Sequence, residues 1–150
     1  MFDNLESLAI ASGLFFTAYQ LRQGWKTNSL GIELMYKERF DQLNQDRKDF
    51  HDLYKKQTSL KSLKKTDKNL YQEIINWENR YFHYEFDRFI IGHKRKAVPR
   101  SLKKAWDCSL QSAMQNKIHK QAWELEIRNE YFLDKDFYNF VDSSSTTICD

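Results

Sequence analysis

Hydrophobic residues form one uninterrupted stretch near the start of the chain and recur at helical intervals after it. Leu8 to Tyr19 contains no charged side chain. Further on, apolar residues return at steps of three and four, which is the spacing of one face of an α-helix. The pattern is clearest from Leu70 to Ile91. It predicts a helix over about 67–91 at the centre of a bundle, which Gly92 ends in a left-handed conformation.

The same spacing predicts the other helices. A second helix is expected over about 28–57, after a break near Gly24, and the lysine-rich stretch 58–69 is expected to be a loop. A fourth helix begins after Pro99 and ends near Asn116. A fifth helix carries Ile118 to Ile127, and a short sixth is capped by Asp134.

Few residues of the chain favour turns, because the 150 residues include four glycines and one proline. Sandwiches and barrels need many such turns, so the fold is predicted to be all-α. We expect an N-terminal membrane or hydrophobic helix at 1–24, an antiparallel helical bundle at 25–142 and a flexible tail at 143–150.

The N-terminal apolar stretch is interpreted as a membrane helix. Its longest span, Leu5 to Leu21, is 17 residues long and includes Glu6 and Gln20, so it is shorter than the usual span of about 20 residues. Small residues between 9 and 13 permit close helix contact, and an oligomer would make a short span tolerable. The side chains expected in lipid are Leu8, Ile10, Leu14, Phe15, Phe16 and Tyr19.

The flanking charges predict the orientation of this helix. Acidic residues precede it, whereas Arg22 and Lys26 follow it. Because positive residues favour the cytoplasmic side, we expect a single-pass protein of the bacterial inner membrane with its C-terminal domain in the cytoplasm. Two alternatives remain open: a core helix of a soluble bundle and a helix lying in the membrane interface.

A series of aromatic residues resembles a known group of proteins. Gln20 to Gln23 is followed by Trp77-Glu78-Asn79, then Trp106, then Trp123-Glu124 and a final Phe137 to Asp142. This order is similar to that of bacterial single-pass membrane proteins with a cytoplasmic, aromatic-rich helical domain and no assigned activity. A remoter resemblance is to the pore-forming membrane accessory protein of RNA-targeting CRISPR systems, which carries a degenerate HEPN-like domain. The resemblance implies architecture and carries over no catalytic residue.

Residues 93–104 (HKRKAVPRSLKK) form a basic segment. Its cations, with the overall net charge of +3, suit the phosphates of RNA, a nucleotide signal or lipid headgroups. The alternative is a solvated loop, which the absence of interleaved aromatic residues favours. The candidate phosphate-binding residues are Lys94, Arg95, Lys96, Arg100, Lys103 and Lys104.

Arg88 and His93 have the Arg-x4-His spacing of HEPN-type ribonucleases. In such chemistry a histidine moves protons while an arginine stabilises charge on the phosphate, and no metal is needed. Phe89 replaces the polar residue usual after the arginine, and short spacings of this kind recur by chance. The two residues are candidate catalytic groups.

The remaining titratable residues suggest no metal site or cofactor. His51, His83 and His119 lack partners at ligand spacing and are expected at the surface, whereas Glu78 is expected to have a hydrogen-bonded structural role. Cys108 and Cys149 are expected to be free thiols, because the domain is predicted to be cytoplasmic.

The sequence therefore favours a non-enzymatic, self-associating membrane protein, with the bilayer and further copies of the chain as partners. A membrane-perturbing or pore-forming role in antiviral defence is the narrower form of this hypothesis. The alternatives are a HEPN-like ribonuclease, or an inactive relative of one, and a soluble interaction module.

Overall fold

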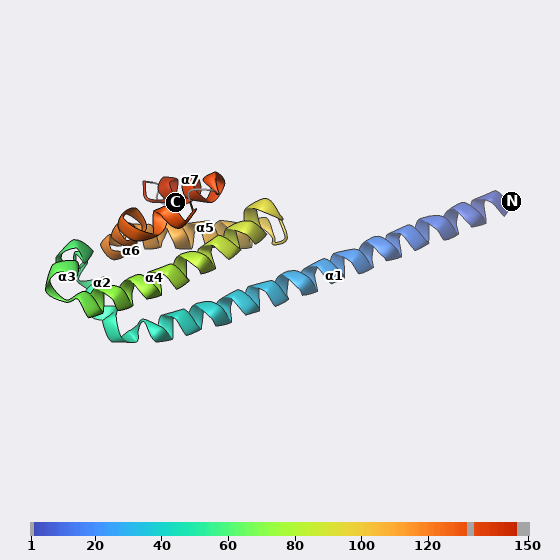
Figure 1. Ribbon diagram of the computed structural model, residues 1–150. Helices are drawn as coiled ribbons and strands as arrows, with labels where there is room; N and C mark the ends of the chain where they lie inside the picture. The colour runs from blue at the N-terminus through green and yellow to red at the C-terminus, as the bar shows by residue number, and fades with distance from the viewer. Residues whose placement is uncertain (1, 132–133, 147–150) are drawn as a thin grey trace. The chain divides into compact units, whose positions relative to one another are not determined.

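The computed structural model describes residues 2–131 and 134–146, and for residues 2–13 the backbone alone. Every regular element in these residues is helical, which confirms the predicted all-α fold (Figure 1). The described residues form seven α-helices: α1 Phe2–Asp46, α2 His51–Lys55, α3 Leu60–Thr66, α4 Lys68–Phe89, α5 Arg100–Met114, α6 Lys117–Ala122 and α7 Lys135–Ser144. Short 3-10 helices (η1 Lys48–Phe50, η4 Arg128–Tyr131) and π-helices (η2 Ile90–Lys94, η3 Trp123–Ile127) connect them.

Helix α1 belongs to two compact units, one ending at Met35 and one beginning at Tyr36. The predicted break near Gly24 is wrong, because α1 continues through it to Asp46. A glycine inside a helix costs only about 1 kcal/mol, which the neighbouring turns tolerate. Among the described helices, none combines the length and the apolarity needed to cross a bilayer. The second unit is called the helical domain below.

Helix α4 is the core of the helical domain, as its pattern predicted. Asp67 caps its first turn by accepting a hydrogen bond from the backbone N–H of Leu70 at 3.0 Å. The buried side chains of α4 lie on more than one side of the helix, as expected of an element with neighbours around it. They include Tyr71, Ile74, Ile75, Trp77, Tyr81, Phe82, Tyr84 and Phe89.

Aromatic contacts join the neighbouring elements to α4. From the last turns of α1, the Tyr36 ring lies 5.7 Å from Tyr84. The Trp77 indole donates to the backbone oxygen of Leu43 at 2.8 Å. On the opposite flank, the Trp123 ring lies 5.0 Å from Phe82. Interlocked rings of this size limit the sliding of α4 and hold its polar side chains at fixed positions.

Two local predictions for the connections are wrong. The stretch expected to be a loop contains α3, because Leu60 and Leu63 are buried and the backbone N–H of Leu60 donates to Gln121 Oε1 at 2.7 Å. The left-handed residue after α4 is Lys96, with a φ of 51°, and not Gly92. The π-helix η2 follows α4 directly and widens the last helical turn before the chain reverses at Lys96.

The helix predicted over about 28–57 is also wrong at its end, because α1 ends at Asp46 and the separate helix α2 follows it. The predicted boundaries at Asn116 and Asp134 agree with the structure. Asn116 separates α5 from α6 and caps α6 through Ile118 N, and Asp134 caps α7. Cys108 is disulfide-bonded, which corrects the expectation of a free thiol there. Cys149 and the rest of 147–150 lie outside the described residues.

Candidate functional sites

The first candidate is the part of α1 from Leu14 to Met35, called the apolar segment below. Most of the large hydrophobic side chains that the described chain leaves exposed belong to it: Leu14, Phe15, Phe16, Tyr19, Leu21, Trp25, Leu30, Leu34 and Met35. Phe15 is 78% exposed. Four residues predicted to meet lipid are therefore uncovered within this chain, while Leu8 and Ile10 lie outside the described side chains. Such an apolar surface is typical of a contact with a membrane or another protein.

The apolar side chains of this segment lie on nearly all sides of the helix. Successive residues are rotated by about 100°, so Phe15, Leu30 and Leu34 share one side while Leu21, Trp25 and Met35 share the other. Between these sides runs a stripe of small and polar residues, Thr17, Gln20, Gly24, Thr27 and Gly31, at steps of three and four. A shallow groove of about 460 Å³ follows part of this stripe. An added Cβ at Gly24 or Gly31 would meet nothing within 4 Å.

The predicted catalytic pair lies in two different environments. Arg88 is 5% exposed, and its Nη1 donates to Glu85 Oε1 at 2.8 Å. Its guanidinium also stacks over the Trp106 ring at 4.9 Å. His93 is partly exposed and bonds through Nε2 to Asp107 Oδ1 at 2.8 Å. No contact in the described chain joins Arg88 to His93, and catalysis by the pair stays a prediction.

The six predicted phosphate-binding cations fall into two groups, those with an acidic partner and those without one among the described residues. Lys94 lies 2.6 Å from Asp134, and this lysine holds the pKa of the aspartate below its ordinary value. Lys103 lies 3.5 Å from Asp107. Arg95, Lys96, Arg100 and Lys104 are exposed and form no ion pair within the described residues. The segment thus contains both neutralised and unneutralised cations.

Some of these cations line a hollow of about 430 Å³ at the turn between α4 and α5. This basic hollow is formed by Gly92, His93, Lys96, Val98, Arg100 and Lys103. The His93 ring is fixed there, because it packs against Phe89 at 4.9 Å and Phe140 at 4.7 Å while Asp107 holds its Nε2. The turn therefore brings together residues that are up to eleven positions apart in sequence.

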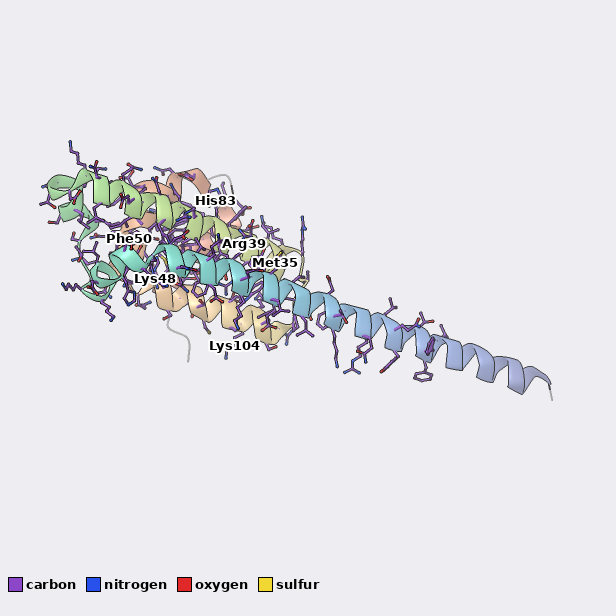
Figure 2. The ribbon with its side chains drawn as sticks, turned by 90° about the horizontal axis from the view of Figure 1, so that it is seen from below. Met35, Arg39, Lys48, Phe50, His83 and Lys104 are labelled. Carbon is purple, nitrogen blue, oxygen red and sulfur yellow. The ribbon has the colours of Figure 1, made fainter. Side chains whose placement is uncertain are left out.

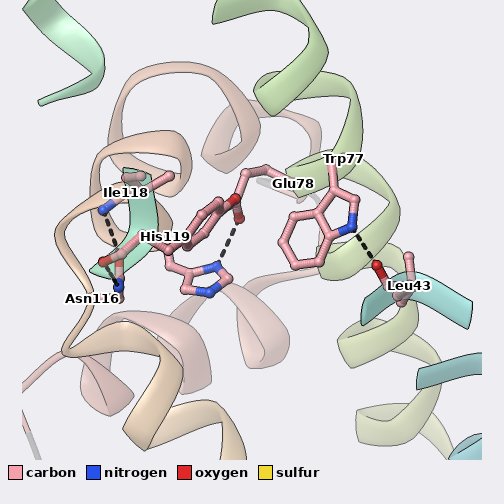
Figure 3. A network of polar contacts seen from close by, with 7 residues as sticks. Leu43, Trp77, Glu78, Asn116, Ile118 and His119 are labelled. Atoms are coloured by element: carbon pink, nitrogen blue, oxygen red, sulfur yellow. Dashed lines mark hydrogen bonds and ion pairs between the residues drawn. The ribbon is translucent and has the colours of Figure 1, made fainter. Parts of the chain in front are cut away.

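A buried polar cluster crosses the centre of the helical domain. Glu78 is fully buried and accepts hydrogen bonds from the Tyr54 hydroxyl at 2.5 Å and from His119 Nδ1 at 2.9 Å (Figure 3). The His119 ring packs 4.8 Å from Tyr81. Burial and the adjacent Glu78 carboxylate raise the pKa of Tyr54 well above its ordinary value. Glu78 has the structural hydrogen bonds predicted for it, but the expected exposure of His119 is wrong.

Two turns further along α4, Glu85 and Arg88 form a second buried pair. Burial raises the pKa of Glu85 to about 6, against the opposing effect of the Arg88 charge. Arg88 Nε has no hydrogen-bond partner in the structure. Each of the two buried acids depends on its partners, because removing the partner of a buried charge is strongly destabilising.

A further groove, of about 420 Å³, lies between the end of α1 and α4 (Figure 2). Arg39 and His83 line opposite parts of it. Its two arginines are paired, Arg39 with Asp87 at 3.0 Å and Arg80 with Asp46 at 2.7 Å. The charges of the groove are balanced, so it favours neither anions nor cations. The basic hollow, by contrast, favours anions.

Sequence reasoning missed the Glu78 cluster because its members are up to 65 positions apart, from Tyr54 to His119. Polar residues on the buried face of α4 were the available signal, since a buried carboxylate needs partners from elsewhere. Among the described side chains, no group of three or more His, Cys, Asp or Glu residues is arranged to hold a metal ion.

No protein-family model, curated protein or solved structure matches this chain. The proposals below therefore depend on the geometry of the chain alone.

Proposed function

We propose that this protein is a self-associating membrane anchor. In this proposal the apolar segment of α1 packs against the same segment of further copies, and the charge-free part of the assembled helices, Ser7 to Leu21, enters the bilayer. The helical domain stays in water on the side of Arg22 and Lys26, the basic residues that follow the charge-free part of α1. The role is one of binding and assembly, without catalysis.

The exposed apolar side chains are the observation that supports this proposal. Among the described residues of the helical domain, Leu125 is the one large apolar side chain that is exposed, whereas Leu14, Phe15 and Phe16 are each more than 60% exposed. A helix that is apolar on nearly all sides favours lipid or a multi-helix interior over a water-facing surface. Covering it requires something other than the described part of this chain.

Assembly of several copies compensates for the short length of the charge-free part of α1. Charge-free sequence extends only from Ser7 to Leu21, and a helix of that length is shorter than the hydrocarbon core. Neighbouring helices can shield Gln20 and Asn28 from lipid, and small residues such as Gly24 let helix backbones approach closely. Pore formation and a role in defence are not needed for this proposal.

Two substitutions separate lipid binding from self-association. Phe15→Asp places a charge on the apolar side of the helix and is expected to release the protein from vesicles. Gly24→Leu fills the small-residue stripe and is expected to abolish chemical crosslinking between copies while vesicle binding persists. An added side chain at residue 24 meets no atom of its own chain, so a loss of crosslinking reports on a neighbouring copy.

Ala18→Leu is the matched control, because residue 18 is equally exposed and lies about 120° around the helix from residue 24. It is expected to crosslink as the unsubstituted protein does. Vesicle flotation of the full chain measures membrane binding, and sedimentation velocity in detergent measures assembly. A full chain that stays monomeric and floats with no vesicle preparation contradicts the proposal.

A further inference from the structure

We propose that the basic hollow at the α4–α5 turn binds a phosphate group carried by a small anionic ligand. The hollow brings His93, Lys96, Arg100 and Lys103 around one volume of about 430 Å³. This volume falls in the range of about 300–1,000 Å³ typical of ligand sites. Arginine and lysine are the side chains that bind phosphate oxygens most strongly, through charge-assisted hydrogen bonds. This inference is independent of the proposed anchoring by α1.

The cations of the hollow are in excess over the acids near it. Asp107 is the one carboxylate in contact with its lining, at 2.8 Å from His93 Nε2 and 3.5 Å from Lys103 Nζ among the described residues. Lys96 and Arg100 remain without an acidic partner in that same part of the chain. An anion in the hollow would neutralise both, and it would not have to displace an existing ion pair.

The backbone holds Lys96 in the hollow at an energetic cost. Its φ of 51° lies in the left-handed region, which is unfavourable for a residue with a side chain. Hydrogen bonds on either side of it fix this conformation, from Arg95 N to Ile90 O at 2.8 Å and from Ala97 N to Ile91 O at 2.9 Å. A glycine would remove the cost, so the presence of lysine here is consistent with a use for its charge.

The other cations of the same segment provide an internal comparison. Arg95 and Lys104 carry the same charge a few residues away but do not line the hollow. Lys94 is already held by Asp134. A diffuse attraction between anions and the whole basic segment would therefore depend on all of these residues, whereas a built site depends on Lys96 and Arg100.

Pyrophosphate is the probe for the first measurement, by calorimetric titration of the purified full chain in detergent at low ionic strength. Removing one charge-assisted hydrogen bond weakens binding roughly tenfold. We expect this loss for Lys96→Ala and for Arg100→Ala, and less than a twofold change for Arg95→Ala and Lys104→Ala. The four side chains are exposed, so the fold is expected to persist in every variant.

A second measurement identifies the source of the phosphate. Vesicles of phosphatidylcholine are compared with vesicles that also contain phosphatidic acid, and the readout is the change in this difference between the full chain and Lys96→Ala, because Arg22 and Lys26 of α1 favour the anionic vesicles equally in both proteins. A preference for phosphatidic acid that Lys96→Ala abolishes assigns the hollow to a lipid headgroup. Pyrophosphate binding without that preference assigns it to a soluble phosphate ligand.

Two results would overturn the inference. One is the absence of any response of the full chain to pyrophosphate and to phosphatidic acid. The other is an equal loss of binding in Arg95→Ala and Lys96→Ala, which would show attraction by the whole segment in place of a site. Neither result bears on self-association of α1, which is measured by crosslinking.

Discussion

The apolar segment of α1 and the helical domain differ in which side chains they bury. The domain buries even charged groups, with Glu78 at 0% and Glu85 at 3% exposure, whereas the apolar segment leaves Phe15 78% exposed. Burying a carboxylate is costly unless partners surround it, and the domain supplies those partners from within. The apolar segment has no such partners in the described chain.

The largest expected effect tests how far the domain depends on its internal partners. Glu78→Ala leaves the buried Tyr54 hydroxyl and His119 ring without their acceptor. We expect the free energy of unfolding to fall by about 3–5 kcal/mol, as measured by urea denaturation followed by near-ultraviolet circular dichroism. A loss below about 1 kcal/mol would mean that the cluster is not the internal support described here.

The pH dependence of stability sharpens the same point at Glu85. Its folded-state pKa of about 6 lies above the ordinary value of 4.5, so the folded protein binds more protons between these two values than the unfolded chain. Stability from this group is therefore present at low pH and is lost as pH rises from about 4.5 to about 6, by about 2 kcal/mol. Denaturation of Glu85→Gln in parallel should show no such slope, and an identical slope would contradict the assignment.

A third prediction uses one substitution at two positions. Lys96→Gly relieves the left-handed conformation and should stabilise the domain by about 1 kcal/mol. Lys104→Gly, inside α5, should destabilise it by about 1 kcal/mol, because glycine weakens a helix interior. Thermal denaturation of the two variants measures both changes, and a loss of stability in Lys96→Gly would contradict the strain described at that turn.

The smallest expected effect is in the apolar segment. Phe15→Ala should change the unfolding free energy of the helical domain by less than about 0.5 kcal/mol, because the ring is exposed. By contrast, Phe82→Ala in the core should cost about 3–5 kcal/mol. Comparable losses in the two variants would show that the domain covers Phe15, which would remove the contrast between the two regions.

The sequence predicted those elements whose signals are local. The period of α4, its Asp67 cap and the Asp134 cap of α7 depend on residues a few positions apart. Helix α3 could not be predicted in this way, because a lysine-rich stretch becomes ordered through Leu60 and its bond to Gln121, 61 positions away. The distant tertiary contact overrides the weak local preference.

The same limit applies to the candidate sites. The sequence shows the basic segment but not which of its cations have acidic partners. Asp134 pairs with Lys94 and Asp107 pairs with Lys103, whereas Lys96 and Arg100 have no acidic partner among the described residues. The exposure of the residues from Leu21 to Met35 was not predicted, whereas that of Leu14, Phe15, Phe16 and Tyr19 was predicted from the charge-free pattern of residues 8–19. The continuity of α1 through Gly24 was not, since one glycine is a weak signal for a break.

Spin labelling of the apolar segment tests the central claim most directly. A nitroxide is attached to a Phe16→Cys variant of the full chain, with the native cysteines replaced by serine, and the protein is reconstituted into vesicles. The account predicts that the label collides more often with oxygen, which concentrates in lipid, than with a water-soluble nickel chelate. A label equally open to the chelate in vesicles and in buffer would contradict it.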